Sequence, residues 1–197
     1  YIPVEKKWVG ARDASVSKVK VELFKTSDPS KVLNTLELNE TNDWKGIFKL
    51  TTDGKLLDPS VKDYAVREVL EEQYGKDYTV AISGDVLVND VVTITNTRNT
   101  VSHTVTKVWK DNNNKLSLRK GIKVQLKQNG ENYGVPIELN ENNQWTYTFK
   151  DLPESLNGVK YEYSVDEVEV PEGYNHSISN EGTKTVITNT ILDPIKK

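Results

Sequence analysis

The chain has 197 residues, enough for one or two domains, and 36% of them are hydrophobic while 28% are charged. This balance is typical of a soluble globular protein and argues against intrinsic disorder. The formal net charge of −3 comes from basic and acidic residues that are well mixed along the chain. Because binding to nucleic acid requires clustered positive charge, no nucleic-acid partner is expected. Apolar runs stay far shorter than the ~20 residues of a membrane-spanning helix, so no membrane insertion is expected.

The sequence contains neither cysteine nor methionine. Disulfides, thiolate metal sites and a cysteine nucleophile are therefore excluded. No signal peptide or wall-sorting segment is visible, and the missing initiator methionine leads us to expect a piece of a longer protein. A large protein outside the cell that has no disulfides needs another source of stability.

The two halves of the chain repeat each other at a period of about 100 residues, which is long enough for a domain of its own. The strongest match joins Leu-Glu-Leu-Asn-Glu-Thr-Asn-Asp-Trp at 36–44 to Ile-Glu-Leu-Asn-Glu-Asn-Asn-Gln-Trp at 137–145. The four tryptophans fall into two equivalent pairs, Trp8 with Trp109 and Trp44 with Trp145. We therefore expect one domain at 1–99 and a second at 100–197.

Alternation of apolar and polar residues dominates both repeats and predicts strands with one buried face. In the second repeat Ile122, Val124 and Leu126 form such a face. Asn129-Gly130 predicts a tight hairpin turn, and Asp28-Pro29 marks the corresponding turn of the first repeat. Short strands at regular spacing, without a long amphipathic helix, predict an all-β fold with a β-sandwich in each repeat.

Each repeat places three polar residues on strand faces that are otherwise apolar, always in the order lysine, glutamate, asparagine. Side chains at positions i and i+2 share a face of a strand. By this rule Lys107 lies with Val105 and Trp109, and the other members follow in the same way. The residues are Lys6, Glu68 and Asn96 in the first repeat and Lys107, Glu167 and Asn189 in the second.

An amine, a carboxylic acid and a carboxamide in one dry core are the reagents for an internal amide bond. Burial lowers the pKa of a lysine and raises that of a glutamate, which favours the neutral form of both. A neutral amine is a competent nucleophile. A protonated glutamate can polarise the asparagine carbonyl and then pass its proton to the leaving ammonia. Proximity in the fold is worth an effective molarity of about 10⁵–10⁸ M.

A simpler interpretation is that these groups only hydrogen-bond to one another or form a buried lysine–glutamate ion pair. The same order and the same facing in both repeats favour the covalent bond.

Four motifs recur at equivalent places in the two repeats. They are Lys-x-Trp near the start, Glu-Leu-Asn-Glu-x-Asn-x-Trp in the middle, Tyr-x-Val-x-Glu later and Ile-Thr-Asn-Thr at the end. Together they resemble the B-type repeat of Gram-positive collagen adhesins (the Cna B domain), and the resemblance covers essentially the whole chain. It implies two tandem inverse immunoglobulin-like β-sandwiches, each with its first and last strands joined by an isopeptide bond. The implied bonds are Lys6–Asn96, assisted by Glu68, and Lys107–Asn189, assisted by Glu167.

The resemblance also implies a function. We expect a non-enzymatic stalk or spacer segment of a cell-wall-anchored Gram-positive surface adhesin or pilin, with a single autocatalytic turnover in each domain. The chain would lie outside the cell, anchored through a C-terminal region not present here, as a monomer whose partners are neighbouring repeats. The alternative is a module that itself binds host extracellular matrix, such as collagen or fibronectin. The parent adhesin could in either case bind host matrix proteins.

The remaining features give no reason to expect a cofactor or a metal. Asp111-Asn112-Asn113-Asn114 resembles the start of a calcium loop, but Lys115 and Leu116 occupy positions that require an acidic or amide side chain and a glycine. We interpret the segment as a solvated loop.

His103 and His176 have no sequence neighbours that suggest a metal site or a catalytic triad, and both are expected at the surface. Tyr133 and Tyr174 are expected to be exposed aromatics that could contact glycans or proteins, although single surface tyrosines rarely do so.

Overall fold

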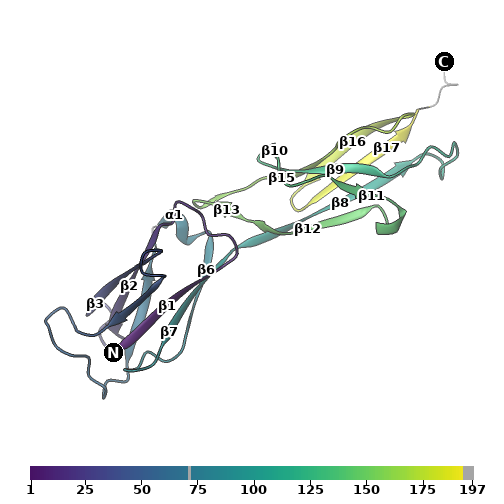
Figure 1. The fold of residues 1–197 in the computed structure, drawn as a ribbon. Coiled ribbons are helices and arrows are strands. Elements are labelled where there is room, and N and C mark those ends of the chain that lie inside the picture. The colour runs from purple at the N-terminus through teal and green to yellow at the C-terminus, as the bar shows by residue number, and fades with distance from the viewer. Residues whose placement is uncertain (71, 193–197) are drawn as a thin grey trace. The chain divides into compact units, whose positions relative to one another are not determined.

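A computed structural model describes residues 1–70 and 72–192, and the chain forms two compact units (Figure 1). The first unit consists of Tyr1–Asn99 together with Ser155–Val159, and the second of Thr100–Glu154 and the chain from Lys160 onward. Regular structure among the described residues is almost entirely β-strand. None of the helices in this part of the chain has the length and apolarity to cross a membrane.

The first unit is built from two sheets. One has the strand order β4-β1-β7-β6 and the other the order β3-β2-β5. The strands of the first sheet are β1 (Ile2–Val9), β4 (Lys45–Phe48), β6 (Tyr78–Ser83) and β7 (Val92–Arg98). Those of the second are β2 (Lys18–Lys25), β3 (Asn34–Asn39) and β5 (Tyr64–Val69), and the short helix α1 (Glu72–Gly75) follows β5.

The second unit repeats this plan. One sheet has the order β12-β8-β17-β16, and in the other β9 pairs with β10, β11 and β15. The strands of the first sheet are β8 (Thr100–Lys110), β12 (Thr146–Pro153), β16 (Tyr174–Glu181) and β17 (Lys184–Ile191). Those of the second are β9 (Ile122–Gln128), β10 (Glu131–Asn132), β11 (Ile137–Leu139) and β15 (Tyr163–Glu167). A one-turn 3₁₀ helix, η1 (Glu141–Asn143), follows β11. β13 (Ser155–Leu156) and β14 (Val159–Lys160) form a two-stranded sheet.

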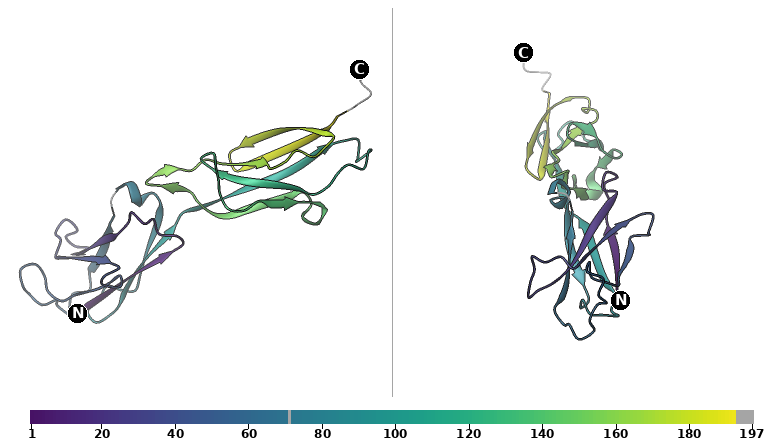
Figure 2. Two further views of the ribbon diagram at one scale, coloured as in Figure 1. Left: turned by 45° about the horizontal axis from the view of Figure 1, so that its top comes forward. Right: turned by 90° about the vertical axis from the view of Figure 1, so that its left-hand side faces the viewer.

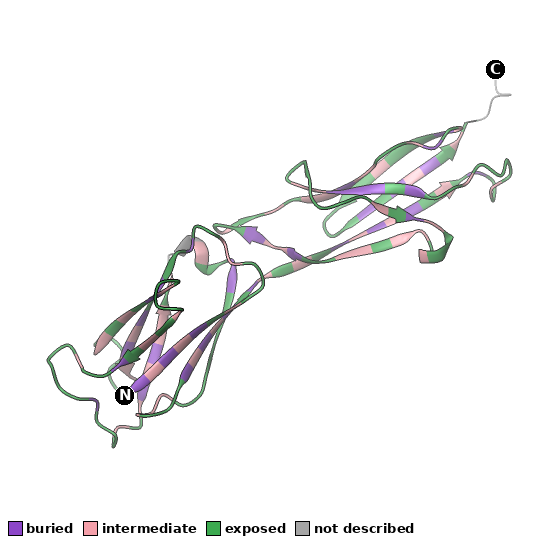
Figure 3. Ribbon diagram, viewed as in Figure 1, coloured by how far each residue is buried: buried purple, intermediate pink, exposed green. Residues whose placement is uncertain are grey.

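Each unit consists of facing sheets (Figure 2), and an apolar core lies between them. In the first unit Val4 and Ile94 of one sheet meet Val21 and Val66 of the other. Buried and exposed positions alternate along the central strands (Figure 3). This alternation is the period of two that a half-buried strand requires. The predicted all-β fold with a sandwich in each repeat is confirmed.

The first and last strands of each unit are parallel neighbours. β1 pairs with β7 so that Lys6 lies opposite Ile94 and Trp8 opposite Asn96. β8 and β17 pair in the same way in the second unit. Parallel pairing between strands so distant in sequence means that the opening and the closing of each unit lie side by side in the middle of a sheet.

The turns follow their residues. Asn129 and Gly130 have φ values of 51° and 82°, so the predicted tight turn is present and joins β9 to β10. Both positions fall in the left-handed region, which asparagine and glycine tolerate better than other residues. Asp28 also lies in a turn, and its backbone N–H donates to the carbonyl of Lys25.

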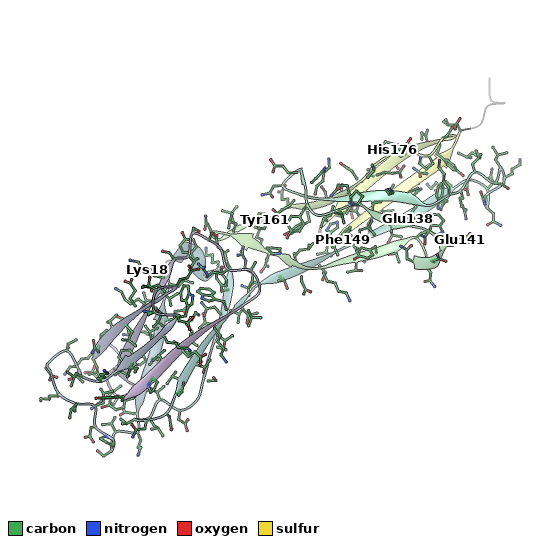
Figure 4. All side chains as sticks on the ribbon, viewed as in Figure 1. Lys18, Glu138, Glu141, Phe149, Tyr161 and His176 are labelled. Carbon is green, nitrogen blue, oxygen red and sulfur yellow. The ribbon has the colours of Figure 1, made fainter. Side chains whose placement is uncertain are left out.

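One surface prediction is wrong. His103 is 2% exposed, and its Nε2 lies 2.7 Å from the hydroxyl of Thr185 on the neighbouring strand β17. His103 lies on the same strand face as Val105 and Lys107, and all three are buried. The prediction failed because it considered only whether His103 had a partner in the sequence and not which strand face it occupies. Burial lowers the pKa of His103. His176 on β16 is exposed, as expected (Figure 4).

Candidate functional site

Strand register brings the lysine and the asparagine of each repeat together. In the first unit Asn96 lies opposite Trp8, two residues beyond Lys6, on the adjacent parallel strand. In the second unit Asn189 lies opposite Trp109, two residues beyond Lys107. Residues two apart share a face, so each lysine and asparagine point into the same core. Both lysines are 4% exposed and both asparagines are fully buried.

The glutamate of each cluster comes from the facing sheet. Glu68 lies on β5 opposite Val21 of β2, and Glu167 lies on β15 opposite Val124 of β9. Each carboxylate therefore approaches the asparagine from the opposite side of the core. The sequence prediction that the three side chains face inward is thus matched by their positions in both units.

In the first unit the glutamate bridges the other two groups. Lys6 Nζ donates to Glu68 Oε2 at 2.6 Å, and Asn96 Nδ2 donates to Glu68 Oε1 at 2.6 Å. The side chains of Lys6 and Glu68 are 0% and 2% exposed, so this ion pair is shielded from water. A carboxylate between an amine and a carboxamide is placed to carry a proton from one nitrogen to the other.

The second unit holds the same groups more loosely. Asn189 Nδ2 donates to Glu167 Oε1 at 3.3 Å, whereas Lys107 Nζ donates to the backbone oxygen of Val108 at 3.5 Å. Glu167 Oε2 is buried without a hydrogen-bond partner among the described residues. The amine and the carboxylate of this unit therefore share a core without forming a close ion pair.

In both clusters the asparagine turns its amide nitrogen, not its carbonyl oxygen, towards the glutamate. Oδ1 of Asn96 and of Asn189 is buried without a hydrogen-bond partner within residues 1–70 and 72–192. The expectation that the glutamate donates to the carbonyl oxygen is therefore not met in this arrangement. The carboxylate instead contacts the nitrogen that would leave as ammonia.

Burial changes the ionisation of these groups in the direction that an acyl transfer requires. Desolvation lowers the pKa of Lys6, against the opposing hydrogen bond to Glu68. Desolvation likewise lowers the pKa of Lys107 to about 8, against the attraction of Glu167 and Asp111. The pKa of Glu167 is raised by desolvation. In the second unit, transfer of a proton from lysine to glutamate is consequently much less costly than in water.

Aromatic rings cover the amine of each lysine. Lys6 Nζ lies 4.5 Å from the ring centroid of Trp8, and Lys107 Nζ lies 3.6 Å from that of Trp109. A second tryptophan meets each ring edge-on, Trp44 at 5.4 Å and Trp145 at 5.2 Å between centroids. The two equivalent tryptophan pairs seen in the sequence therefore help to shield the two lysine amines from solvent.

Two asparagines three residues apart precede the second tryptophan in both repeats, and they help to position it. In the second unit Asn140 Oδ1 accepts from the backbone N–H of Asn143, while Asn143 Oδ1 accepts from that of Asn140. These two hydrogen bonds form a capping box at the start of η1, whose first residue, Glu141, is labelled in Figure 4. The chain then passes through Trp145 at a φ of 61°, and the Trp145 carbonyl accepts from the backbone N–H of Lys107 at 2.8 Å.

Sequence reasoning missed a buried ion pair beside the second cluster. Asp111 is 1% exposed and pairs with Arg119, and Tyr174, which is 5% exposed, donates its hydroxyl to the same carboxylate. The interpretation of residues 111–114 as a solvated loop is therefore wrong for Asp111, and the expected exposure of Tyr174 is wrong as well. Both errors arise because Arg119 and Tyr174 are separated from Asp111 in sequence. Tyr133 is exposed, as expected.

Comparison with known proteins places the chain in a family. The sequence profile of the Cna protein B-type domain matches residues 2–97 and 103–190. The chain belongs to the Cna protein B-type domain family. The collagen adhesin of Staphylococcus aureus is 35% identical to it over 180 residues, which are 91% of this chain and 14% of the adhesin. The chain thus spans a small part of the length of this relative.

Solved structures of Cna B-type and pilin proteins are also similar. A single B repeat unit (B1) of the collagen binding surface protein of S. aureus is 30% identical, with 97% of both chains covered and a TM-score of 0.47. The major pilin protein (T-13) of Streptococcus pyogenes is 12% identical, with 96% of both chains covered and a TM-score of 0.44. The resemblance drawn from the sequence motifs is confirmed, because the Cna B-type domain matches each half of the chain.

We expect the turn before Trp145 to depend on its asparagine cap. Asn143→Ala removes two side-chain hydrogen bonds, and loss of such a cap costs about 0.5–2 kcal/mol. Chemical unfolding should show the second unit destabilised by that amount, together with a weaker near-ultraviolet circular dichroism signal from the Trp109–Trp145 pair. Asn142→Ala is the matched control, because the exposed Asn142 side chain makes no hydrogen bond to any residue that the structure describes, and only its backbone N–H contacts the cap. Equal behaviour of the two variants would contradict this role of the cap.

Proposed function

We propose that the chain is a stalk segment of a Gram-positive surface adhesin or pilin in which each unit is closed by an isopeptide bond. The bonds join Lys6 to Asn96 and Lys107 to Asn189. One observation carries the proposal: twice, a buried lysine and a buried asparagine share one face of the parallel first and last strands, and a glutamate of the facing sheet accepts a hydrogen bond from the asparagine. Unreacted groups of this kind are costly to bury, which favours their conversion to a neutral amide.

The proposed reaction conserves atoms and needs no cofactor. The lysine ammonium first passes a proton to the glutamate, which leaves a neutral amine. The lysine nitrogen then forms a bond to Cγ of the asparagine, and the bond from Cγ to Nδ2 breaks. Protons carried by the glutamate allow Nδ2 to leave as ammonia, consistent with the contact between Nδ2 and the carboxylate in both units. Escape of ammonia makes the step irreversible.

A bond at this place would change how a unit carries tension. Force entering through the first strand would cross the amide and leave through the adjacent last strand. The chain between lysine and asparagine would then bear no load, and the unit could not be pulled open. Closing so long a loop should also stabilise each unit by about 4–5 kcal/mol, by analogy with disulfides. Such properties suit a spacer outside the cell, anchored to the wall and joined to neighbouring repeats.

Direct binding of a host matrix protein is the weaker alternative. Its support is the name of the collagen adhesin, of which this chain covers 14%. The residues that distinguish this chain chemically are buried in the two cores, where they cannot contact a macromolecule. We therefore propose a structural role and place ligand binding elsewhere in the parent protein.

Mass spectrometry of the intact chain tests the proposal directly. The purified protein should be lighter than the sequence mass by two molecules of ammonia, one for each unit. Digestion should release two branched peptides, one containing Lys6 and Asn96 and the other Lys107 and Asn189. A mass equal to that of the sequence would overturn the proposed bonds.

Removing the glutamate should prevent one bond and leave the other. In Glu167→Ala only one ammonia should be lost, because the second unit has no group to carry the proton. That unit should lose about 4–5 kcal/mol of stability and become sensitive to protease, as scanning calorimetry and limited proteolysis would show. Asp166→Ala is the control, since Asp166 faces away from the core and pairs with Lys127. Loss of both ammonias in Glu167→Ala would refute the proton-carrying role.

Bond formation in the second unit should follow a bell-shaped pH profile. The reactive form is the lysine–glutamate pair holding one proton between them. On the alkaline side the rate should fall as this proton is lost, near the Lys107 pKa of about 8. On the acid side it should fall as a second proton binds, at a pH above the ordinary glutamate value because the pKa of Glu167 is raised. Timed refolding followed by mass spectrometry would measure the profile, and a rate independent of pH would contradict it.

A further inference from the structure

A buried carboxylate, that of Asp111, lies on the same face of the chain as Lys107 and Trp109 and takes no part in the proposed reaction. Asp111 directly follows β8, four residues after Lys107. Both of its oxygens are fully used: Arg119 donates from Nε at 2.9 Å and from a terminal nitrogen at 2.7 Å. The hydroxyl of Tyr174 donates at 2.9 Å and the backbone N–H of Asn114 at 3.0 Å. These bonds, led by that from Arg119, lower the pKa of Asp111 to about 2.

Trp109 connects this ion pair to the reacting lysine. Its ring centroid lies 3.6 Å from Lys107 Nζ and 5.7 Å from the guanidinium carbon of Arg119. Tyr174 meets the same ring at 4.9 Å between centroids. The lysine and the arginine are therefore two cations against one indole, and the Asp111 carboxylate that pairs with the arginine also favours the charged form of the lysine.

The first unit provides a natural comparison. The residue two after Trp8 is Gly10, where the second unit has Asp111 two after Trp109. Lys6 pairs directly with Glu68 at 2.6 Å, whereas Lys107 makes no such pair with Glu167.

We propose that Arg119 is a positioning residue for the crosslink of the second unit, because it holds Asp111 in a closed ion pair and prevents this carboxylate from retaining Lys107 as an ammonium ion. The inference rests on the proposed isopeptide function. It adds a residue outside the lysine–glutamate–asparagine cluster. Asp111 anchors the loop that follows β8, and Arg119 neutralises its charge.

The charged and titratable groups around Lys107 come from several elements. Glu167 on β15 and Asp111 after β8 favour its charged form, and Arg119 opposes it. Tyr174 on β16 donates to Asp111 and has its pKa raised to about 12 by burial and that contact, so it remains neutral. His176 acts on Glu167 and Glu141 acts on Arg119, both at longer range. Arg119 is the member of this set that neutralises Asp111 by direct contact.

The test compares three variants of the full chain, refolded from denaturant in buffers across a range of pH and quenched at timed points. Digestion and mass spectrometry then follow the two branched peptides separately, so that the first unit is an internal control. In Arg119→Gln the second unit should crosslink about tenfold more slowly at neutral pH, with its alkaline limb moved up by about one pH unit. Asp111→Asn with Arg119→Gln should restore the rate, and Lys120→Gln, which removes an exposed charge, should change nothing.

A second measurement does not depend on bond formation, and it distinguishes an effect on the Lys107 pKa from a folding defect. In Glu167→Gln, where the amine stays unreacted, nuclear magnetic resonance titration should give a higher Lys107 pKa once Arg119→Gln is added. An unmoved Lys107 pKa, or a double variant as slow as Arg119→Gln alone, would overturn this inference and leave Arg119 a packing residue. Retention of both ammonias by the unaltered chain would instead overturn the proposed function itself.

Discussion

Parallel pairing of the opening strand with the closing strand is the constraint on which each unit depends. It places Trp8 opposite Asn96 and Trp109 opposite Asn189, and thereby sets a lysine and an asparagine on one inward face. No local preference produces this contact, because the partners are separated by nearly a whole repeat. An antiparallel strand on either side holds the pair in the centre of the sheet. The chemistry of the core follows from this topology.

Much of this arrangement could be predicted from the sequence because a strand has a period of two. The inward facing of Lys107, Glu167 and Asn189 follows from alternation with apolar neighbours, and the recurrence of the motifs doubled the signal. Contacts across loops could not be predicted in the same way. Asp111 looks like a loop residue until Arg119 and Tyr174 are brought to it, and the side of the asparagine amide that meets the glutamate is fixed only by three-dimensional packing.

The two units solve one electrostatic problem differently. In the first, Glu68 contacts both nitrogens at 2.6 Å and charge is balanced within the cluster. In the second, the lysine rests on an indole and a separate acid is neutralised by its own arginine. The shared frame is the pair of tryptophans and the asparagine-capped turn that delivers the second of them. Conserved scaffolding thus tolerates different local balances of charge around an equivalent lysine.

Register between β8 and β17 has a consequence for how errors in folding would be handled. A shift by a single residue would turn Lys107 or Asn189 towards solvent, since alternate side chains point to opposite faces. A misaligned molecule would then not bring together the groups from which the proposed isopeptide bond would form. Misaligned strands could still separate and pair again, whereas the correctly aligned strands would be joined permanently by the proposed bond. The closure would in this way act as a proofreading step, sealing only those molecules whose strands have already found their native partners.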